Sequence, residues 1–162
     1  MPPRKKKPPD FDPNHEEYPD FYYYDLFVSQ GISYYNLGQY QQAIEEYDKA
    51  IKLTPKAAEG YYNRGLSYGR LGQHQRAIED YDKVIELAPD YATAYNDRGI
   101  SYVRLGQNER AIEDFDKVIE LDPNDAWAYR NRGVSYGSLD QTERAIEDFD
   151  KAIKLDPDNA EA

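Results

Sequence analysis

Arginines recur at a spacing of 34 residues and are the first side chains with the means to do chemistry. Arg64, Arg98 and Arg132 stand in the phrases NRG, DRG and NRG. A row of guanidinium groups is able to bind an anionic ligand through planar sets of N–H donors. One residue of a helix is about 100° of rotation, however, which directs these side chains between neighbouring units rather than into an open groove. We therefore expect each arginine to pair with a carboxylate of an adjacent helix.

Acidic clusters repeat with the same spacing, as EEYD, EDYD and EDFD. The carboxylates of residues 113, 114 and 116 are hard oxygen donors of the kind that divalent cations prefer. Opposite charges stand four residues apart in and around these clusters, as Glu79 with Lys83 and Arg76 with Asp80, which is the spacing of ion pairs on a helix. We expect solvated ion pairs, with no metal site and no cofactor.

Groups for acid-base or nucleophilic catalysis are scarce. The chain has no cysteine and only two histidines, His15 and His74. His74 stands where the other units have Tyr40, Asn108 and Thr142, and neither histidine has a nucleophile at a recognisable spacing. The glycines follow the repeat instead of forming a phosphate-binding loop. We expect no enzymatic activity.

The elements that carry these residues repeat as units of 34 residues. Each unit closes on a proline, at Pro55, Pro89, Pro123 and Pro157. This period is typical of stacked helix pairs, in which no unit buries its apolar side without a neighbour. The second unit predicts a first helix over about 58–72 and a second over about 75–87. The array is expected to start near residue 20.

Small residues and turn residues recur in the same pattern. Gly99 and Ala111 are small where two helices of a unit are expected to cross closely, so a leucine at either place should overpack the crossing. Gly72 and its equivalents stand where a helix ends in the left-handed conformation. Asp140 takes that place in the fourth unit, so we expect the last turn to be the least stable of the four.

The pattern resembles the tetratricopeptide repeat family over residues 24–159. The family's signature places in the first unit hold Phe27, Gly31, Tyr34, Gly38, Tyr40, Ala43, Tyr47, Ala50 and Pro55. Polar residues depart from the usual apolar type at Gln30, Arg64, Arg98 and Arg132, and Asp140 departs from the turn glycine. The resemblance implies an all-α, right-handed solenoid of antiparallel helix pairs whose first helices line a concave groove for peptides or partner proteins.

The resemblance divides the chain into three parts. Residues 1–19 are expected to be a flexible, proline-rich tail, and residues 20–159 a domain of four repeats (24–57, 58–91, 92–125 and 126–159). Residues 160–162 match the start of a truncated fifth repeat. The acidic and aromatic part of the tail, from Asp10 to Tyr18, is either a groove ligand or a solvated segment.

Candidate groove residues lie on one stripe of the first helices. Asn63, Asp97 and Asn131 are either a ladder that binds a peptide backbone or ordinary solvated residues. Arginine beside aromatic residues is favoured at recognition surfaces, although Trp127 is equally suited to packing between the third and fourth units. The candidate set is Tyr35, Asn36, Tyr62, Asn63, Arg70, Asp97, Arg104, Trp127, Arg130 and Asn131.

Charge is divided between the two helices of each unit. The formal net charge is −11, and four of the positive charges lie in the run from Arg4 to Lys7. The second helices are rich in acids and the first helices in arginines, so a concave face made of first helices should prefer an acidic ligand. The acidic body argues against nucleic acid as a partner. No apolar run marks a signal sequence or a membrane span, so we expect a soluble, cytoplasmic protein.

The leading hypothesis is a non-catalytic scaffold that binds an extended, acidic peptide or a partner protein in the groove. The alternative is a structural module without a groove ligand, engineered or excised from a longer array, that associates with another copy through its last helix. Its apolar residues for that contact are Ile146, Phe149, Ala152 and Ile153. An adaptor that binds nucleic acid through the basic tail is a third hypothesis.

Overall fold

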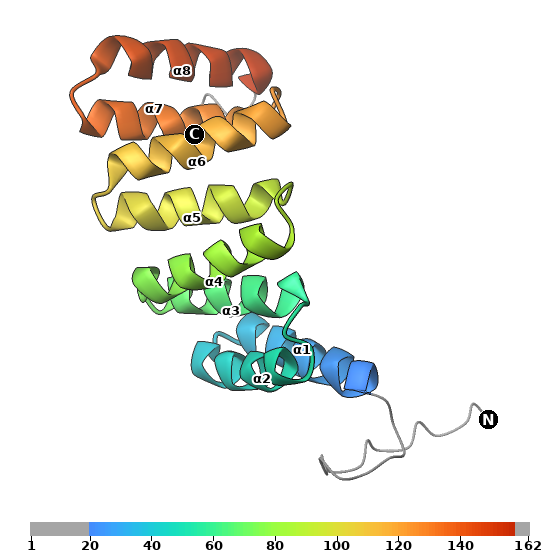
Figure 1. Cartoon of the computed structure of the whole chain (residues 1–162). Helices are drawn as coiled ribbons and strands as arrows, with labels where there is room; N and C mark the ends of the chain where they lie inside the picture. The colour runs from blue at the N-terminus through green and yellow to red at the C-terminus, as the bar shows by residue number, and fades with distance from the viewer. Residues whose placement is uncertain (1–19, 158–162) are drawn as a thin grey trace.

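The computed structural model describes residues 20–157, which form eight helices in four antiparallel pairs (Figure 1). The helices are α1 Asp20–Asn36, α2 Tyr40–Leu53, α3 Ala58–Arg70, α4 His74–Leu87, α5 Ala92–Arg104, α6 Asn108–Leu121, α7 Ala126–Ser138 and α8 Thr142–Leu155. The predicted all-α solenoid is confirmed. The expectations for residues 1–19 and 160–162 lie outside the described residues.

The helices of each pair are joined by a turn of three residues, and the middle one is in the left-handed conformation. Gly38, Gly72 and Gly106 have φ of 74°, 72° and 71°, and Asp140 has φ of 59°. Among the described residues Asp140 is the only one other than glycine with a positive φ. The sequence therefore located all four turns correctly, and the fourth turn places a side chain where glycine is favoured.

A glycine on each first helix lets the aromatic ring of the second helix approach its backbone. A Cβ at Gly99 would lie 2.8 Å from Cε1 of Phe115, which is fully buried, and Ala111 is also fully buried. The predicted close crossing is confirmed, and the group that fills it is the aromatic ring. A cluster of Ile78, Tyr102, Ala111 and Phe115 continues this packing from α4 through α5 to α6.

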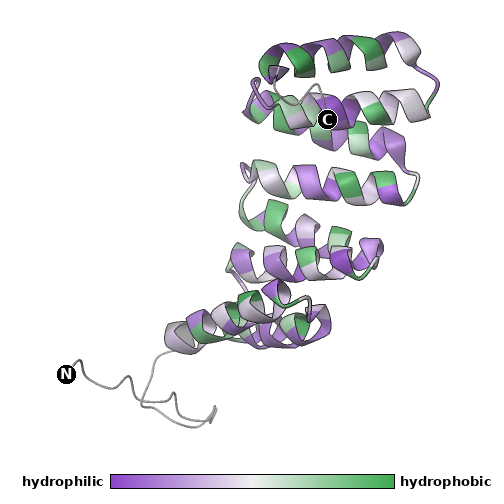
Figure 2. Ribbon diagram, turned by 180° about the vertical axis from the view of Figure 1, so that it is seen from behind, coloured by the Kyte–Doolittle hydropathy of each residue, from purple (hydrophilic) through white to green (hydrophobic). Residues whose placement is uncertain are grey.

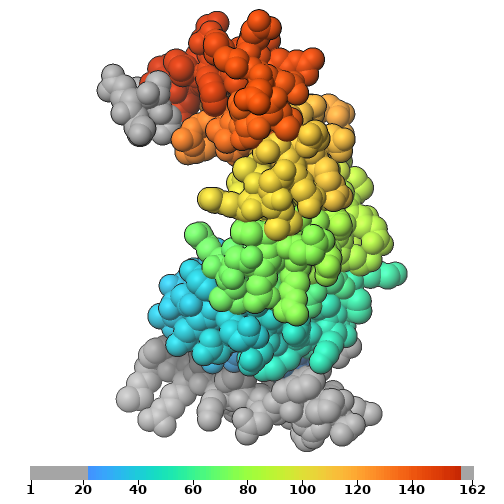
Figure 3. All heavy atoms as spheres, turned by 90° about the vertical axis from the view of Figure 1, so that its left-hand side faces the viewer, coloured from blue at the N-terminus to red at the C-terminus, as the bar shows by residue number. Residues whose placement is uncertain are grey.

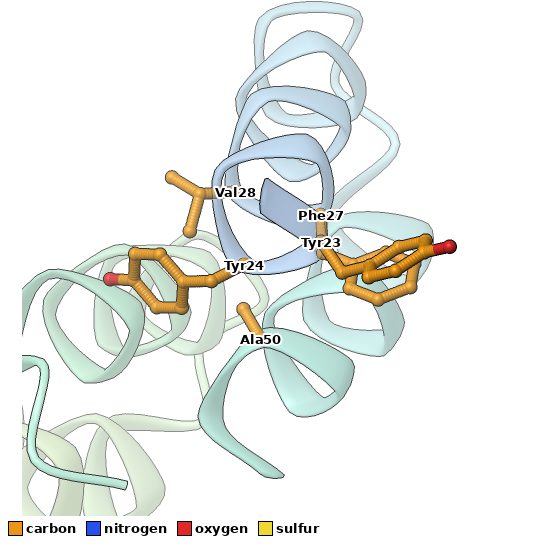
Figure 4. Packing of buried hydrophobic residues seen from close by; sticks show 5 residues of the cluster. All are labelled: Tyr23, Tyr24, Phe27, Val28 and Ala50. Atoms are coloured by element: carbon orange, nitrogen blue, oxygen red, sulfur yellow. The ribbon is translucent and has the colours of Figure 1, made fainter. Parts of the chain in front are cut away.

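Aromatic residues fill the contact between the two helices of the first pair. Tyr23, Tyr24, Phe27 and Val28 extend from α1 to either side of Ala50 on α2 (Figure 4). All five are buried. Such clusters bury apolar surface between consecutive helices, which is the main stabilising term in an array whose contacts are local.

The first helices line the inner side of the curve. Each helix packs against the next along the chain, and the backbones of α1 and α3, α3 and α5, and α5 and α7 also approach within 8 Å. Within residues 20–157 no two second helices make such an approach. Because one row of helices is closer together than the other, the stack curves toward α1, α3, α5 and α7. Figure 3 shows the units following one another in chain order along the molecule.

None of the helices within residues 20–157 combines the length and apolar character that a membrane crossing requires.

Candidate peptide-binding groove

Each repeated arginine binds two carboxylates from two different units. Arg98 donates from Nε and Nη2 to Asp114 of its own unit, at 2.9 and 2.6 Å, and from Nη1 to Asp82 of the preceding unit, at 2.5 Å. Its guanidinium also lies 5.5 Å from the centre of the Tyr95 ring and 5.9 Å from that of Tyr102. Arg64 and Arg132 repeat the arrangement. The expected pairing between units is confirmed.

Burial makes the two charged partners of each pair depend on each other. Burial lowers the pKa of Arg98, but its hydrogen bonds to Asp114 and Asp82 outweigh that effect and raise the pKa above the ordinary value. Burial also raises the pKa of Asp114, and Arg98 opposes the change. The Asp114 side chain is only 5% exposed, so it depends on the arginine for its hydrogen bonds.

Two expectations about charge need correction. The arginines that make the first helices basic include Arg64, Arg98 and Arg132, but their guanidinium groups are held between helices by carboxylates and so add no basic charge to the concave face. The ion pairs at a spacing of four are also wrong. Lys83 binds Glu86 at 2.8 Å instead of Glu79. Arg76 donates to Gln73 at 2.9 Å instead of to Asp80, whose two carboxylate oxygens accept from Arg64.

The repeated carboxylates are therefore occupied by arginine rather than arranged for a cation. Asp80 and Asp82 of the same cluster bind different arginines, Arg64 and Arg98. Across residues 20–157 no three acidic or histidine side chains gather in a way that would hold a metal ion.

Three side-chain contacts join successive first helices, and each joins residues 35 positions apart. Arg70 donates from Nε to Oη of Tyr35 at 2.9 Å. Tyr62 donates to Oδ2 of Asp97 at 2.8 Å, and Asn131 donates to Oδ1 of Asn96 at 3.2 Å. The structure thus brings five of the ten candidate groove residues into these contacts: Tyr35, Arg70, Tyr62, Asp97 and Asn131.

Asp97 takes part in a further side-chain contact of the first helices. Besides the bond from Tyr62, it accepts a hydrogen bond from Nδ2 of Asn96 at 3.1 Å. Burial raises its pKa above the ordinary value, while Tyr62, Asn96 and the charge of Arg70 act in the opposite direction. The same burial, together with Asp97, raises the pKa of Tyr62. Asp97 is therefore an acceptor used within the protein and a negative charge in the middle of the groove.

The other five candidates make no side-chain hydrogen bond or ion pair with the described residues. The side-chain amide of Asn63 and the guanidinium of Arg104 have no hydrogen-bond or ion-pair partner within residues 20–157, and Asn36 is exposed without such a partner as well. Arg130 stacks on Trp127, with its guanidinium 5.4 Å from the ring centre. Trp127 is 53% exposed, so it is available to a ligand.

Sequence reasoning left two features out of the candidate set. Asn96 joins Asp97 to Asn131, which only the offset of 35 residues reveals. Exposed apolar side chains also follow the first helices at Ile32, Ile100 and Val134, which are 39%, 37% and 45% exposed. Their signal was present, because with Leu66 they occupy the same place in all four units.

The fold defines an all-α helical-repeat protein, and comparison with known families identifies the repeat. A model described as TPR repeat matches residues 31–72 and 101–140. Models described as Tetratricopeptide repeat match residues 58–91 and 126–159, and residues 80–113. The chain belongs to the tetratricopeptide repeat family.

Solved structures of MamA are similar along most of the chain. A crystal structure of MamA is 29% identical over 86% of this chain and 81% of that chain, with a TM-score of 0.81. The structure of MamA 41-end from Desulfovibrio magneticus RS-1 is 27% identical over 83% and 76%, with a TM-score of 0.80. Curated proteins gave no significant match. The repeat family and these structures support a protein-interaction scaffold.

Proposed function

We propose that the chain is a non-catalytic scaffold whose concave face binds an extended, acidic segment of a partner protein. The observation that carries the proposal is a contrast among arginines. Arg98 is saturated by carboxylates, whereas Arg104 on the same helix has none within the described residues. Arg130 has an exposed aromatic ring, Trp127, as its contact. Unpaired guanidinium groups on a curved face favour a ligand that supplies carboxylates.

The other groove residues support an extended ligand with mixed side chains. Ile32, Ile100 and Val134 offer exposed apolar contacts in successive units. The free amide of Asn63 has both donors and an acceptor, so it suits a peptide backbone of any sequence. The carboxylate of Asp97 repels ligand carboxylates at the centre of the groove. We therefore place the ligand's carboxylates at Arg104 and Arg130.

A peptide-binding measurement tests the proposal. The probes are labelled peptides of equal length that alternate glutamate with aromatic or aliphatic residues, and matched peptides with lysine in place of glutamate. We expect the acidic set to bind, and added salt to weaken it because the contacts are exposed. Equal binding of the lysine set would contradict the acidic preference.

Charge reversal locates the site. Combining Arg104→Glu with Arg130→Glu should weaken binding of the acidic peptides by about tenfold or more, since each lost charge-assisted hydrogen bond is worth about 1.5–3 kcal/mol. Combining Lys52→Glu with Lys154→Glu is the matched control, because it makes the same total charge change on α2 and α8, two of the outer helices. A loss of equal size in the control would mean that net charge rather than the groove governs binding.

Self-association is a second candidate function, and the observation that favours it is the exposure of apolar side chains on α8. Ile146, Phe149 and Ile153 are 54%, 36% and 48% exposed, and Ala152 is half-buried. Sedimentation equilibrium over a range of protein concentrations, with Ile146→Asp as the comparison, tests this function. A mass that stays monomeric in the wild type would exclude it.

A further inference from the structure

Helix α8 carries apolar or aromatic residues at the same places as the inner second helices, but no helix of residues 20–157 covers them. Figure 1 shows α8 at one end of the stack, and Figure 2 shows hydrophobic residues along it. Phe149 is 36% exposed, whereas its equivalents Tyr81 and Phe115 are 2% and 0% exposed. Ile146 is 54% exposed against 3% for Ile78. The inner residues are covered because α5 packs on α4 and α7 packs on α6.

An unpaired carboxylate lies beside this apolar surface. Asp48, Asp82 and Asp116 each accept a hydrogen bond from Nη1 of the next unit's arginine at 2.5 Å. Asp150 stands in the same place of the fourth unit, is exposed, and has no ion pair with any described residue. In each inner unit the arginine comes from the helix that also covers the apolar residues. One helix would therefore satisfy both features of α8.

The inner covering helices show what such a helix needs. Each has a small residue four positions before its arginine: Gly60 and Arg64, Ala94 and Arg98, and Ala128 and Arg132. The small residue is required by space, because a Cβ at Gly60 would lie only 3.0 Å from Cγ1 of Ile51. A tyrosine follows each small residue, and its ring centre lies 5.4–5.7 Å from the guanidinium.

We propose that Ile146, Phe149, Asp150 and Ile153, the α8 face, form a docking surface for an amphipathic helix of a partner protein. This helix presents an arginine to Asp150, four residues after a glycine or alanine. Helix α1 of a second copy lacks both features, because Leu26 stands at the small place and Gln30 at the arginine place. The α8 face thus selects a helix by charge as well as by shape, independently of what the groove binds.

A pair of synthetic helices tests the proposal on the full chain. The first probe is a hydrocarbon-stapled peptide with the sequence of residues 125–140, since a helix this short is marginal without a constraint. The second probe is identical except for glutamine in place of its equivalent of Arg132. The wild type should bind the arginine peptide about tenfold more tightly, as expected for one charge-assisted hydrogen bond.

Two variants test whether the preference for the arginine peptide arises at α8. Asp150→Asn should bring the affinity ratio of the two peptides close to one. Glu147→Gln removes the same charge from the same helix and should keep the ratio, because its equivalents Glu79 and Glu113 stay exposed where a helix does cover the face. Circular dichroism checks that both variants fold. No preference for arginine, a preference that survives in Asp150→Asn, or binding of neither peptide would overturn the proposal.

Sedimentation of the chain alone separates a partner helix from a second copy. A monomer that binds the arginine peptide is the expected result. A dimer that Ile146→Asp disrupts and Asp150→Asn leaves intact would assign the α8 face to another copy of the chain and overturn the proposal.

Discussion

Arg98 and Arg104 lie on the same helix, yet their surroundings give them different roles. The Arg98 side chain is 18% exposed and binds Asp114 and Asp82, so it joins one unit to the next. Arg104 lies six residues on, is exposed, and has no partner within the described chain. Residue type alone does not separate a stabilising arginine from a ligand-binding one. The separation comes from which side of the helix faces a second helix.

Replacing these two arginines should have very different effects on stability. Arg98→Ala leaves the buried carboxylate of Asp114 without its partner, and breaking a buried pair in this way costs about 3 kcal/mol. Arg104→Ala removes an exposed side chain and should change the free energy of unfolding by less than about 0.5 kcal/mol. Urea unfolding followed by circular dichroism measures both. Similar losses in the two variants would show that the Arg98 contacts do not stabilise the fold.

Asp97 should make stability depend on pH. Burial raises its pKa in the folded protein above the ordinary value of 3.8, so the folded state binds the proton more tightly than the unfolded state. Its contribution is therefore fully present below the unfolded pKa and is lost as the pH rises through the folded pKa. The stability of Asp97→Asn relative to the wild type should increase between about pH 3 and pH 7, measured by urea unfolding at each pH.

A second variant tests the cause of that dependence. Tyr62→Phe removes a hydrogen bond that favours the charged form of Asp97, so its stability relative to the wild type should fall over the same pH range. Each substitution also disturbs local packing, at Asn96 or at the aromatic ring of residue 62. A loss of stability from that cause does not vary with pH, so it would shift the plot of stability difference against pH without changing its slope. A flat difference in both variants would mean that Asp97 has the same proton affinity in the folded and unfolded states.

At the scale of helices, most of the structure was predictable because neighbours in sequence are neighbours in space. The period of 34 residues located every helix pair, and the glycine pattern located the turns, including the left-handed Asp140. The arginine pairs also followed from rotation along one helix. The contacts between Tyr62 and Asp97 and between Asn96 and Asn131 did not, because their offset of 35 depends on how successive units are rotated against each other. That rotation is a property of the packed array, not of one unit.

Two helical glycines should respond in opposite directions to the same substitution. Gly99→Ala places a Cβ 2.8 Å from the Phe115 ring, and overpacking of this kind costs about 1–3 kcal/mol. Gly69 lies in α3, and a Cβ added there would meet no neighbouring atom within 4 Å. Gly69→Ala should therefore stabilise the protein by up to about 1 kcal/mol through helix propensity. Thermal unfolding of both variants makes the comparison.

A second substitution tests whether the methyl group added in Gly99→Ala clashes with the ring of Phe115. Phe115→Leu shortens the side chain that faces Gly99, so the double variant should lose less stability than the sum of the two single variants. Strict additivity would mean that the methyl group and the ring do not compete for the same space.

At the scale of the whole molecule, position in the array decides how much a residue contributes. Phe115 and Phe149 stand in the same phrase, AIEDFDK, and each ring packs against a glycine of its own unit. Phe115 is fully buried beneath α7, whereas Phe149, on a helix that no later helix within residues 20–157 covers, is 36% exposed. Within residues 20–157 the first and fourth units each have one neighbour instead of two, so in this one-dimensional array they are expected to open before the second and third.

Truncating the two phenylalanines measures this difference directly. Phe115→Ala removes a ring that two units share and should cost about 4 kcal/mol. Phe149→Ala removes a partly solvated ring and should cost about half as much, because less apolar surface is lost from the interior. Hydrogen exchange locates the loss: the first variant should lower protection in α4 to α8, and the second in α7 and α8 alone. If a helix binds the α8 face, the two costs should converge when the stapled arginine peptide saturates the protein, because the peptide then gives Phe149 the cover that α7 gives Phe115.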